Sequence, residues 1–115
     1  MGSEELPSRW EGVEKRVPAR LEDLRGPSDG ILALPLHLAW SGMTEFDLGD
    51  YRERLMCYQI VLINGQRQDA ERYLDPDHLV SGWPDLRRLF AVQLSRAWED
   101  RLPELRPAGA LSGPV

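Results

Sequence analysis

The sequence has very little of the chemistry that most often builds a metal or redox site. It contains one cysteine and two histidines in 115 residues. The single cysteine, Cys57, excludes an internal disulfide framework and a multi-cysteine zinc site. His37 and His78 are too far apart in sequence for the i and i+4 spacing of a helical zinc site. We therefore predict no metal and no cofactor, and a cytoplasmic protein suits this cysteine usage.

Long apolar runs and glycine-rich loops are missing as well. No segment approaches the roughly 18 consecutive apolar residues of a membrane span. The acidic, polar N-terminus also lacks the apolar core of a signal peptide. The glycines are isolated, so no phosphate-binding loop is expected, and no Gly-x-Ser-x-Gly nucleophile motif occurs. Because no base, nucleophile or metal set stands out, we do not expect an enzyme.

Lysine is nearly absent, and the charge is unevenly placed. Lys15 is the only lysine among the 14 basic residues, and the formal net charge is −5. Residues 1–50 hold ten acidic and five basic residues, whereas residues 51–115 hold nine of each. An acidic chain lacks the positive surface that supplies most non-specific affinity for nucleic acid. Nucleic acid is therefore a less favoured partner than protein.

The composition predicts one domain with different ends. Residues 1–30 are charged and broken by proline, so we expect them to be flexible or to order on a partner. Residues 31–103 are expected to form a single helical domain that begins with an extended arm over 31–40. Residues 104–115 are expected to form a flexible C-terminal tail.

The strongest helical pattern covers residues 50–64. Asp50 is a suitable N-cap and Gly65 a suitable C-terminal stop. The apolar residues between them occupy most of the circumference of the helix, which is typical of a central helix buried on several sides.

Further helices are expected towards the C-terminus. Residues 66–74 form a short amphipathic pattern, and Asp75 followed by Pro76 is a typical start for the next short helix. Trp83-Pro84 is expected to open a last helix that runs to Leu102 (84–102). The sequence thus predicts a mainly α fold, a small bundle of three to four helices with an N-terminal extended arm or edge strand.

The extended arm carries large apolar residues at every second position, namely Leu32, Leu34, Leu36, Leu38 and Trp40. This period predicts a strand with one buried face. Pro35 lacks an amide hydrogen and so favours an edge strand or an extended arm. We find no other convincing strand in residues 43–105. We therefore expect the arm to lie on helices or to pair outside the protomer.

We predict a non-enzymatic interaction or regulatory module, such as an antitoxin-like protein or an accessory subunit. Tryptophan and neighbouring apolar residues dominate the energy of many interfaces. The N-terminal acids would steer the encounter with a basic or nucleotide-binding surface. Self-association as a homodimer is the alternative use of the arm. The predicted partner-binding residues are Leu34, Leu36, Leu38, Trp40, Phe46 and Trp83.

Two other functions remain open. The first is a dimeric DNA-binding regulator that uses residues 66–102, with a helix-turn-helix around Asp75-Pro76. The start of its second helix carries Asp77 and His78 rather than arginine, which does not favour base reading. The second is a small enzyme with a carboxylate and arginine site, for which the candidates are Asp47, Asp69 and Arg72.

A dispersed set of residues over about 32–105 resembles that of short actinobacterial proteins of unknown function, some of them associated with nucleotidyltransferase-type toxins or with regulators. The resemblance implies a small cytoplasmic partner or antitoxin-like protein, and it carries over no catalytic residue. The residues that carry it are Trp40-Ser41-Gly42, Phe46-Asp47-Leu48, Tyr58, Val61-Leu62, Gly65, Asp69, Tyr73-Leu74, Leu79-Val80, Trp83 and Arg96-Ala97-Trp98.

Overall fold

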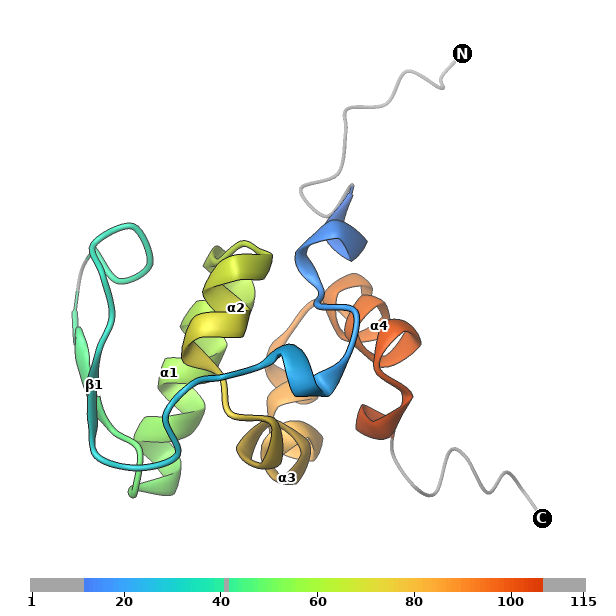
Figure 1. The fold of residues 1–115 in the computed structure, drawn as a ribbon. Helices are drawn as coiled ribbons and strands as arrows, with labels where there is room; N and C mark the ends of the chain where they lie inside the picture. The colour runs from blue at the N-terminus through green and yellow to red at the C-terminus, as the bar shows by residue number, and fades with distance from the viewer. Residues whose placement is uncertain (1–11, 41, 107–115) are drawn as a thin grey trace.

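The computed structural model describes residues 12–40 and 42–106. In this part of the chain, four α-helices follow a two-stranded antiparallel hairpin, so the predicted mainly helical fold is confirmed (Figure 1). None of these helices is long and apolar enough to cross a membrane. The elements in chain order are η2 (Val13–Arg16), η3 (Leu21–Asp23), β1 (Ile31–Ala33), β2 (Glu45–Asp47), α1 (Tyr51–Asn64), α2 (Arg67–Tyr73), α3 (Pro76–Leu86), η4 (Arg87–Leu89), α4 (Val92–Arg101) and η5 (Pro103–Leu105).

Helix α1 begins and ends where the local signals predict. The carboxylate of Asp50 accepts a hydrogen bond from the backbone N–H of Glu53 at 3.1 Å. The helix stops at Asn64, and a Cβ atom on Gly65 would lie 2.6 Å from the carbonyl oxygen of Val61. Glycine is therefore required at this stop for steric reasons.

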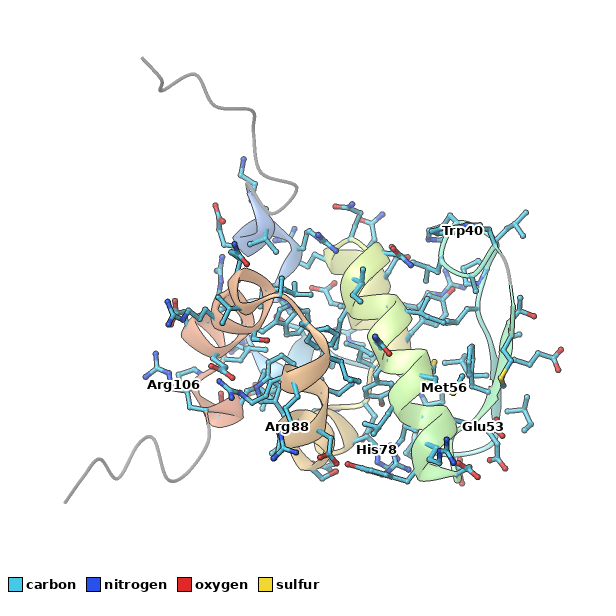
Figure 2. All side chains as sticks on the ribbon, turned by 180° about the vertical axis from the view of Figure 1, so that it is seen from behind. Trp40, Glu53, Met56, His78, Arg88 and Arg106 are labelled. Atoms are coloured by element: carbon cyan, nitrogen blue, oxygen red, sulfur yellow. The ribbon has the colours of Figure 1, made fainter. Side chains whose placement is uncertain are left out.

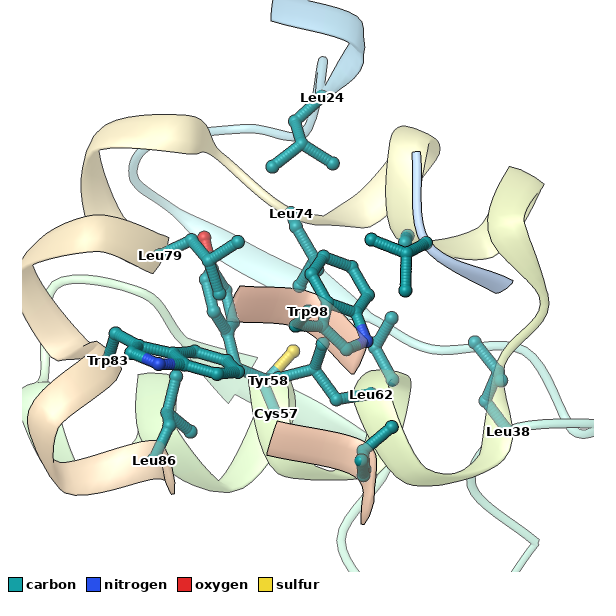
Figure 3. Packing of buried hydrophobic residues seen from close by; sticks show 14 of the residues in the cluster. Leu24, Leu38, Cys57, Tyr58, Leu62, Leu74, Leu79, Trp83, Leu86 and Trp98 are labelled. Atoms are coloured by element: carbon teal, nitrogen blue, oxygen red, sulfur yellow. The ribbon is translucent and has the colours of Figure 1, made fainter. Parts of the chain in front are cut away.

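The central position predicted for α1 is also confirmed. Figure 3 shows side chains of α1 packed against those of α3 and α4, including the two buried indoles Trp83 and Trp98. The ring centroids of these indoles lie 6.4 Å apart. The fully buried residues of α1 are Cys57, Tyr58, Val61 and Leu62.

The single last helix predicted for residues 84–102 is wrong. Helix α3 continues through Pro84 to Leu86, and the backbone is extended at Phe90 and Ala91 before α4 begins. The break folds α4 back on α3, so that the apolar stripes of both helices reach the same core.

A buried carboxylate holds α4 against α3. Glu99 accepts hydrogen bonds from Trp83 Nε1 at 2.8 Å and from Arg87 Nε at 2.6 Å. Burial of the Glu99 carboxyl opposes its ionisation, but the hydrogen bonds from Arg87 and Trp83 and the charges of Arg87 and Arg106 outweigh burial and lower its pKa. The charged form of Glu99 is thus the one that the fold stabilises.

The N-terminal segment differs from the prediction for residues 1–30. Residues 12–30 pack on the helices of their own chain, and Val13, Val17 and Leu24 are buried in the core. Residues 1–11 lie outside the described part. Beyond α4, Leu105 in η5 is also buried, whereas 107–115 lie outside the description. Val13, Val17 and Leu24 thus dock on the chain's own core.

Arg16 explains why this segment is held in place. Its guanidinium donates hydrogen bonds to the carbonyl oxygens of Leu62, Ile63 and Gly65 at 3.1, 2.6 and 3.1 Å. These carbonyls lie at the C-terminal end of α1, where the helix leaves acceptors unsatisfied and the macrodipole favours a positive charge. One side chain therefore closes the end of the central helix.

The hairpin supplies the mate that the arm was expected to lack. Strand β1 pairs with β2 in antiparallel register, with Leu32 opposite Phe46. The expectation of no second strand in residues 43–105 is therefore wrong. Strand β2 has only three residues and one apolar side chain among them, so it carries no recognisable period in the sequence. Its stability comes from packing, because Phe46 is buried.

Replacing Arg16 with Met should lower the free energy of unfolding by about 1.5–3 kcal/mol, the usual range for hydrogen bonds to a charged group. Met keeps the apolar stem and removes the donors. Lys15→Met is the matched control on the same short helix, since Lys15 is exposed, and it should change stability by less than about 0.5 kcal/mol. Equilibrium unfolding in urea measures both. Equal losses in the two variants would contradict the capping role.

The lowered pKa of Glu99 predicts a specific dependence of stability on pH. A carboxyl group whose pKa is lower in the folded state stabilises the protein above its unfolded pKa of about 4.3. This contribution is lost as the pH falls through the folded pKa. Glu99→Gln should therefore be less stable than the native chain at neutral pH, and the difference should shrink below about pH 4.3. Unfolding in urea at a series of pH values measures it, with the exposed Glu104→Gln as control.

Candidate functional site

The loop that joins β1 to β2 carries three exposed large apolar side chains. Leu36 is 75%, Trp40 65% and Met43 44% exposed. We call these three residues the loop surface. Figure 2 shows Trp40 at the end of this loop, far from Glu53 at the opposite end of α1. Exposed apolar residues are ordinary singly, but three in one short loop indicate a contact surface.

The loop is anchored on both sides of these exposed residues. The carbonyl oxygen of Pro35 accepts hydrogen bonds from the N–H groups of Leu38 and Ala39, both at 3.0 Å. This turn reverses the chain and sends Leu38 and Ala39 into the core while Leu36 stays outside. At the base of the loop, Leu34 N–H donates to the carbonyl of Thr44 at 2.8 Å.

Two contacts tie the loop to the helices. His37 Nε2 lies 3.0 Å from Asp69 Oδ1, and the second carboxylate oxygen of Asp69 accepts the backbone N–H of Gln66 at 2.9 Å. The side-chain amide of Asn64 donates to the carbonyl of Leu38 at 3.3 Å. Asp69 thus both caps the start of α2 and holds the loop in position.

The structure divides the six residues predicted to bind a partner. Leu36 and Trp40 are exposed and can touch a partner directly. The other four pack in the core and are not available for direct contact, which corrects their predicted role: Leu34, Leu38, Phe46 and Trp83. The period of two placed all members of the arm on one face, but the turn at Pro35 interrupts that face.

Sequence reasoning missed two exposed residues. Ile31 begins β1 and is 66% exposed. Met43 lies near the end of the loop, just before β2. Met43 follows Gly42, whose φ of +75° marks a tight change of direction. A large apolar residue beside such a glycine, outside any regular pattern, is the signal that could have identified Met43.

The residues considered for an enzyme site are engaged separately. Asp47 Oδ1 accepts a hydrogen bond from the N–H of Gly49 at 2.9 Å. The carboxylate of Asp69 contacts His37 and caps the start of α2. Arg72 lines a hollow of about 420 Å³ that two acidic and two basic side chains share, so its charges are balanced. The residues lining it are Asp23, Arg25, Gln68, Glu71 and Arg72.

Neither nucleophilic nor metal chemistry gains support from the described residues. Burial raises the pKa of the Cys57 thiol to about 12, so this thiol stays protonated at neutral pH. Among residues 12–40 and 42–106, no group of three His, Cys, Asp or Glu side chains could hold a metal ion.

The two helices expected for a helix-turn-helix are present as α2 and α3, with Asp75 capping α3. The exposed start of α3 nevertheless lacks donors for DNA. Asp77 is acidic, and His78 Nε2 is already within 2.7 Å of the carbonyl oxygen of Ser28. This surface therefore does not match the positive face that a recognition helix needs.

The segment that contains the hairpin is acidic in sequence. Between Arg25 and Arg52 the sequence contains no lysine or arginine. The same stretch holds four acidic residues, of which Glu45 and Asp47 stand on the exposed face of β2. An apolar loop next to acidic side chains would complement an apolar pocket with a basic rim.

Comparison of the chain with protein-family models, with curated proteins and with solved structures gives no match. The resemblance to short actinobacterial proteins therefore stays a prediction. The case for function rests on the loop surface and on the charges around it.

The exposure of Trp40 predicts its fluorescence. In a Trp10→Phe background, three indoles remain, and Trp83 and Trp98 are buried. Adding Trp40→Phe should remove most of the emission that acrylamide quenches and should shift the remaining spectrum to the blue. Adding Trp83→Phe instead should leave the quenched fraction in place. A quenched fraction that survives the loss of Trp40 would contradict an exposed loop indole.

Proposed function

We propose that this protein is a non-enzymatic interaction module that binds a partner protein through the loop surface. The observation that carries the proposal is the exposure of Leu36 and Trp40 in a loop whose residues Leu34, Leu38 and Ala39 are anchored in the core. Packing within the described chain leaves both side chains uncovered. A bound partner would remove this apolar area from water.

The anchors of the loop favour tight binding. Association loses free energy whenever a flexible segment must become ordered. Here the turn at Pro35, the pair of His37 and Asp69, and the bond from Asn64 to Leu38 already order the loop. Trp40 is thus presented on a prepared scaffold, as expected of an interface anchor.

The partner inferred from the charges is a protein with an apolar pocket and a basic rim. Complementary charge raises the rate of encounter and suppresses wrong partners. A protein with a basic, nucleotide-binding surface offers such a basic rim. The proposed mechanism is therefore steric, as in an antitoxin-like or accessory regulatory subunit that covers a surface of its target.

The test compares two pairs of substitutions at exposed apolar residues. Leu36→Ser with Trp40→Ser removes the two most exposed side chains of the loop surface. Leu89→Ser with Val92→Ser removes side chains that are 48% and 57% exposed. These control residues lie at η4 and at the start of α4, and Figure 1 shows α4 and the hairpin on opposite sides of the molecule.

Tagged versions of the native chain and of both double variants are purified from the native host, and co-eluting proteins are quantified. We expect one protein at stoichiometric amounts with the native chain and the control pair. Its binding to the purified loop variant should be at least about 30-fold weaker, since truncating an interface anchor costs about 2 kcal/mol or more. Equal loss in both pairs, or equal retention, would overturn the proposal. A chain that elutes alone as a dimer would also overturn it.

A further inference from the structure

Strand β1 has an outer edge whose backbone groups have no partner in the described chain. Leu34 N–H donates to Thr44, and Leu48 N–H donates to Gly30, at the two ends of the ladder. In an antiparallel pair, hydrogen-bonded and non-hydrogen-bonded positions alternate. The N–H and C=O groups of Ile31 and Ala33 therefore point away from β2. No hydrogen bond within residues 12–40 and 42–106 satisfies them.

The outer edge of β2 is closed by the same chain at Asp47. The N–H of Asp47 donates to Glu53 Oε1 at 2.8 Å, and its carbonyl oxygen accepts the N–H of Asp50 at 3.0 Å. Both contacts come from the start of α1 and the residue before it. The hairpin thus has a β1 edge that is open along its length and a β2 edge that is closed at Asp47, and an open edge is a template for another strand.

Resting on the proposed function, we propose that the β1 edge pairs with an extended segment of the partner, which adds a third strand to the hairpin. Ile31 and Ala33 offer up to four backbone hydrogen bonds to such a segment. The exposed side chain of Ile31 lies on the solvent face of the strand, beside the added residues. The strand leads through Leu34 and Pro35 to Leu36, so one partner can cover the edge and the loop surface together.

The charges select the occupant of the edge. Glu45 and Asp47 lie opposite Ala33 and Ile31 on the exposed face of the hairpin. Long basic side chains of an added strand can reach across β1 towards these carboxylates, over two strand spacings of about 4.8 Å each. The occupant is therefore a segment in which arginine or lysine alternates with apolar residues. A second copy of this chain would instead bring the same acids and a second net charge of −5 to the interface.

The experiment uses the full chain and a synthetic peptide in which arginine and valine alternate. Hydrogen exchange of single amides is followed by NMR with and without the peptide. In the free chain, the amides of Ile31 and Ala33 should exchange fast and that of Leu32 slowly, because Leu32 is paired with Phe46. The peptide should slow Ile31 and Ala33 at least about tenfold. A peptide of alternating glutamate and valine should leave both rates unchanged.

Ala33→Pro is the matching variant, with Ala33→Thr as its control. Proline removes the outward N–H without touching the ladder, which uses Leu32 and Leu34, whereas threonine keeps this N–H. We expect the proline variant to bind the peptide at least about tenfold more weakly than the threonine variant. Slow exchange of Leu32 in both variants verifies that the hairpin has folded.

Unchanged exchange of Ile31 and Ala33 with the arginine peptide, or equal affinity of the two variants, would overturn the strand addition. Protection that grows with the concentration of the chain alone would assign the edge to a second copy and would also overturn it. The proposed function is judged separately by Leu36→Ser with Trp40→Ser. If the partner is lost by the double variant Leu36→Ser with Trp40→Ser but not by Ala33→Pro, the loop binds the partner and the β1 edge does not.

Discussion

The structure depends on one constraint: α1 is apolar around most of its circumference and must be covered on several sides. Helices α2, α3 and α4 cover part of it, the N-terminal segment closes its end through Arg16, and the hairpin covers the remaining face through Phe46, Leu34 and Leu38. A two-stranded hairpin of this length would not be stable alone in water. The hairpin is ordered because its buried side chains pack against α1. Its other face is therefore exposed to solvent.

The features that could be predicted from the sequence are those that local chemistry decides. Asp50 and Asp75 cap their helices through their own carboxylates, and Gly65 fills a stop where no Cβ fits, so neighbouring residues are enough to place these boundaries. The break at Phe90 and the strand β2 could not be found in this way. Both exist because distant surfaces need covering, and nothing in a window of ten residues carries that information.

The same limit applies to the candidate site. Leu36 and Leu38 have the same chemistry and the same place in a period of two, yet one is exposed and the other buried. What separates them is the turn at Pro35, where two amides bond to one carbonyl and the chain reverses. The tryptophans show the same contrast. Trp83 is held in the core by Glu99, whereas Trp40 is exposed and has no such hydrogen bond within the described residues. Residue type predicted that a tryptophan anchors a contact. Only tertiary contacts decide whether that contact lies in the core or on the exposed surface.

The acids of the hairpin give a physical reason why an open edge next to an apolar loop need not lead to self-association. Exposed strand edges usually invite pairing between copies, and charged residues on the strand are a common protection. Glu45 and Asp47 stand on the exposed face next to the open β1, and no lysine or arginine lies between Arg25 and Arg52 to offset them. Two copies would meet with like charges, whereas a basic segment would meet opposite ones. One set of side chains would thus discourage the wrong partner and favour the right one, which is how a short edge could be specific without a deep pocket.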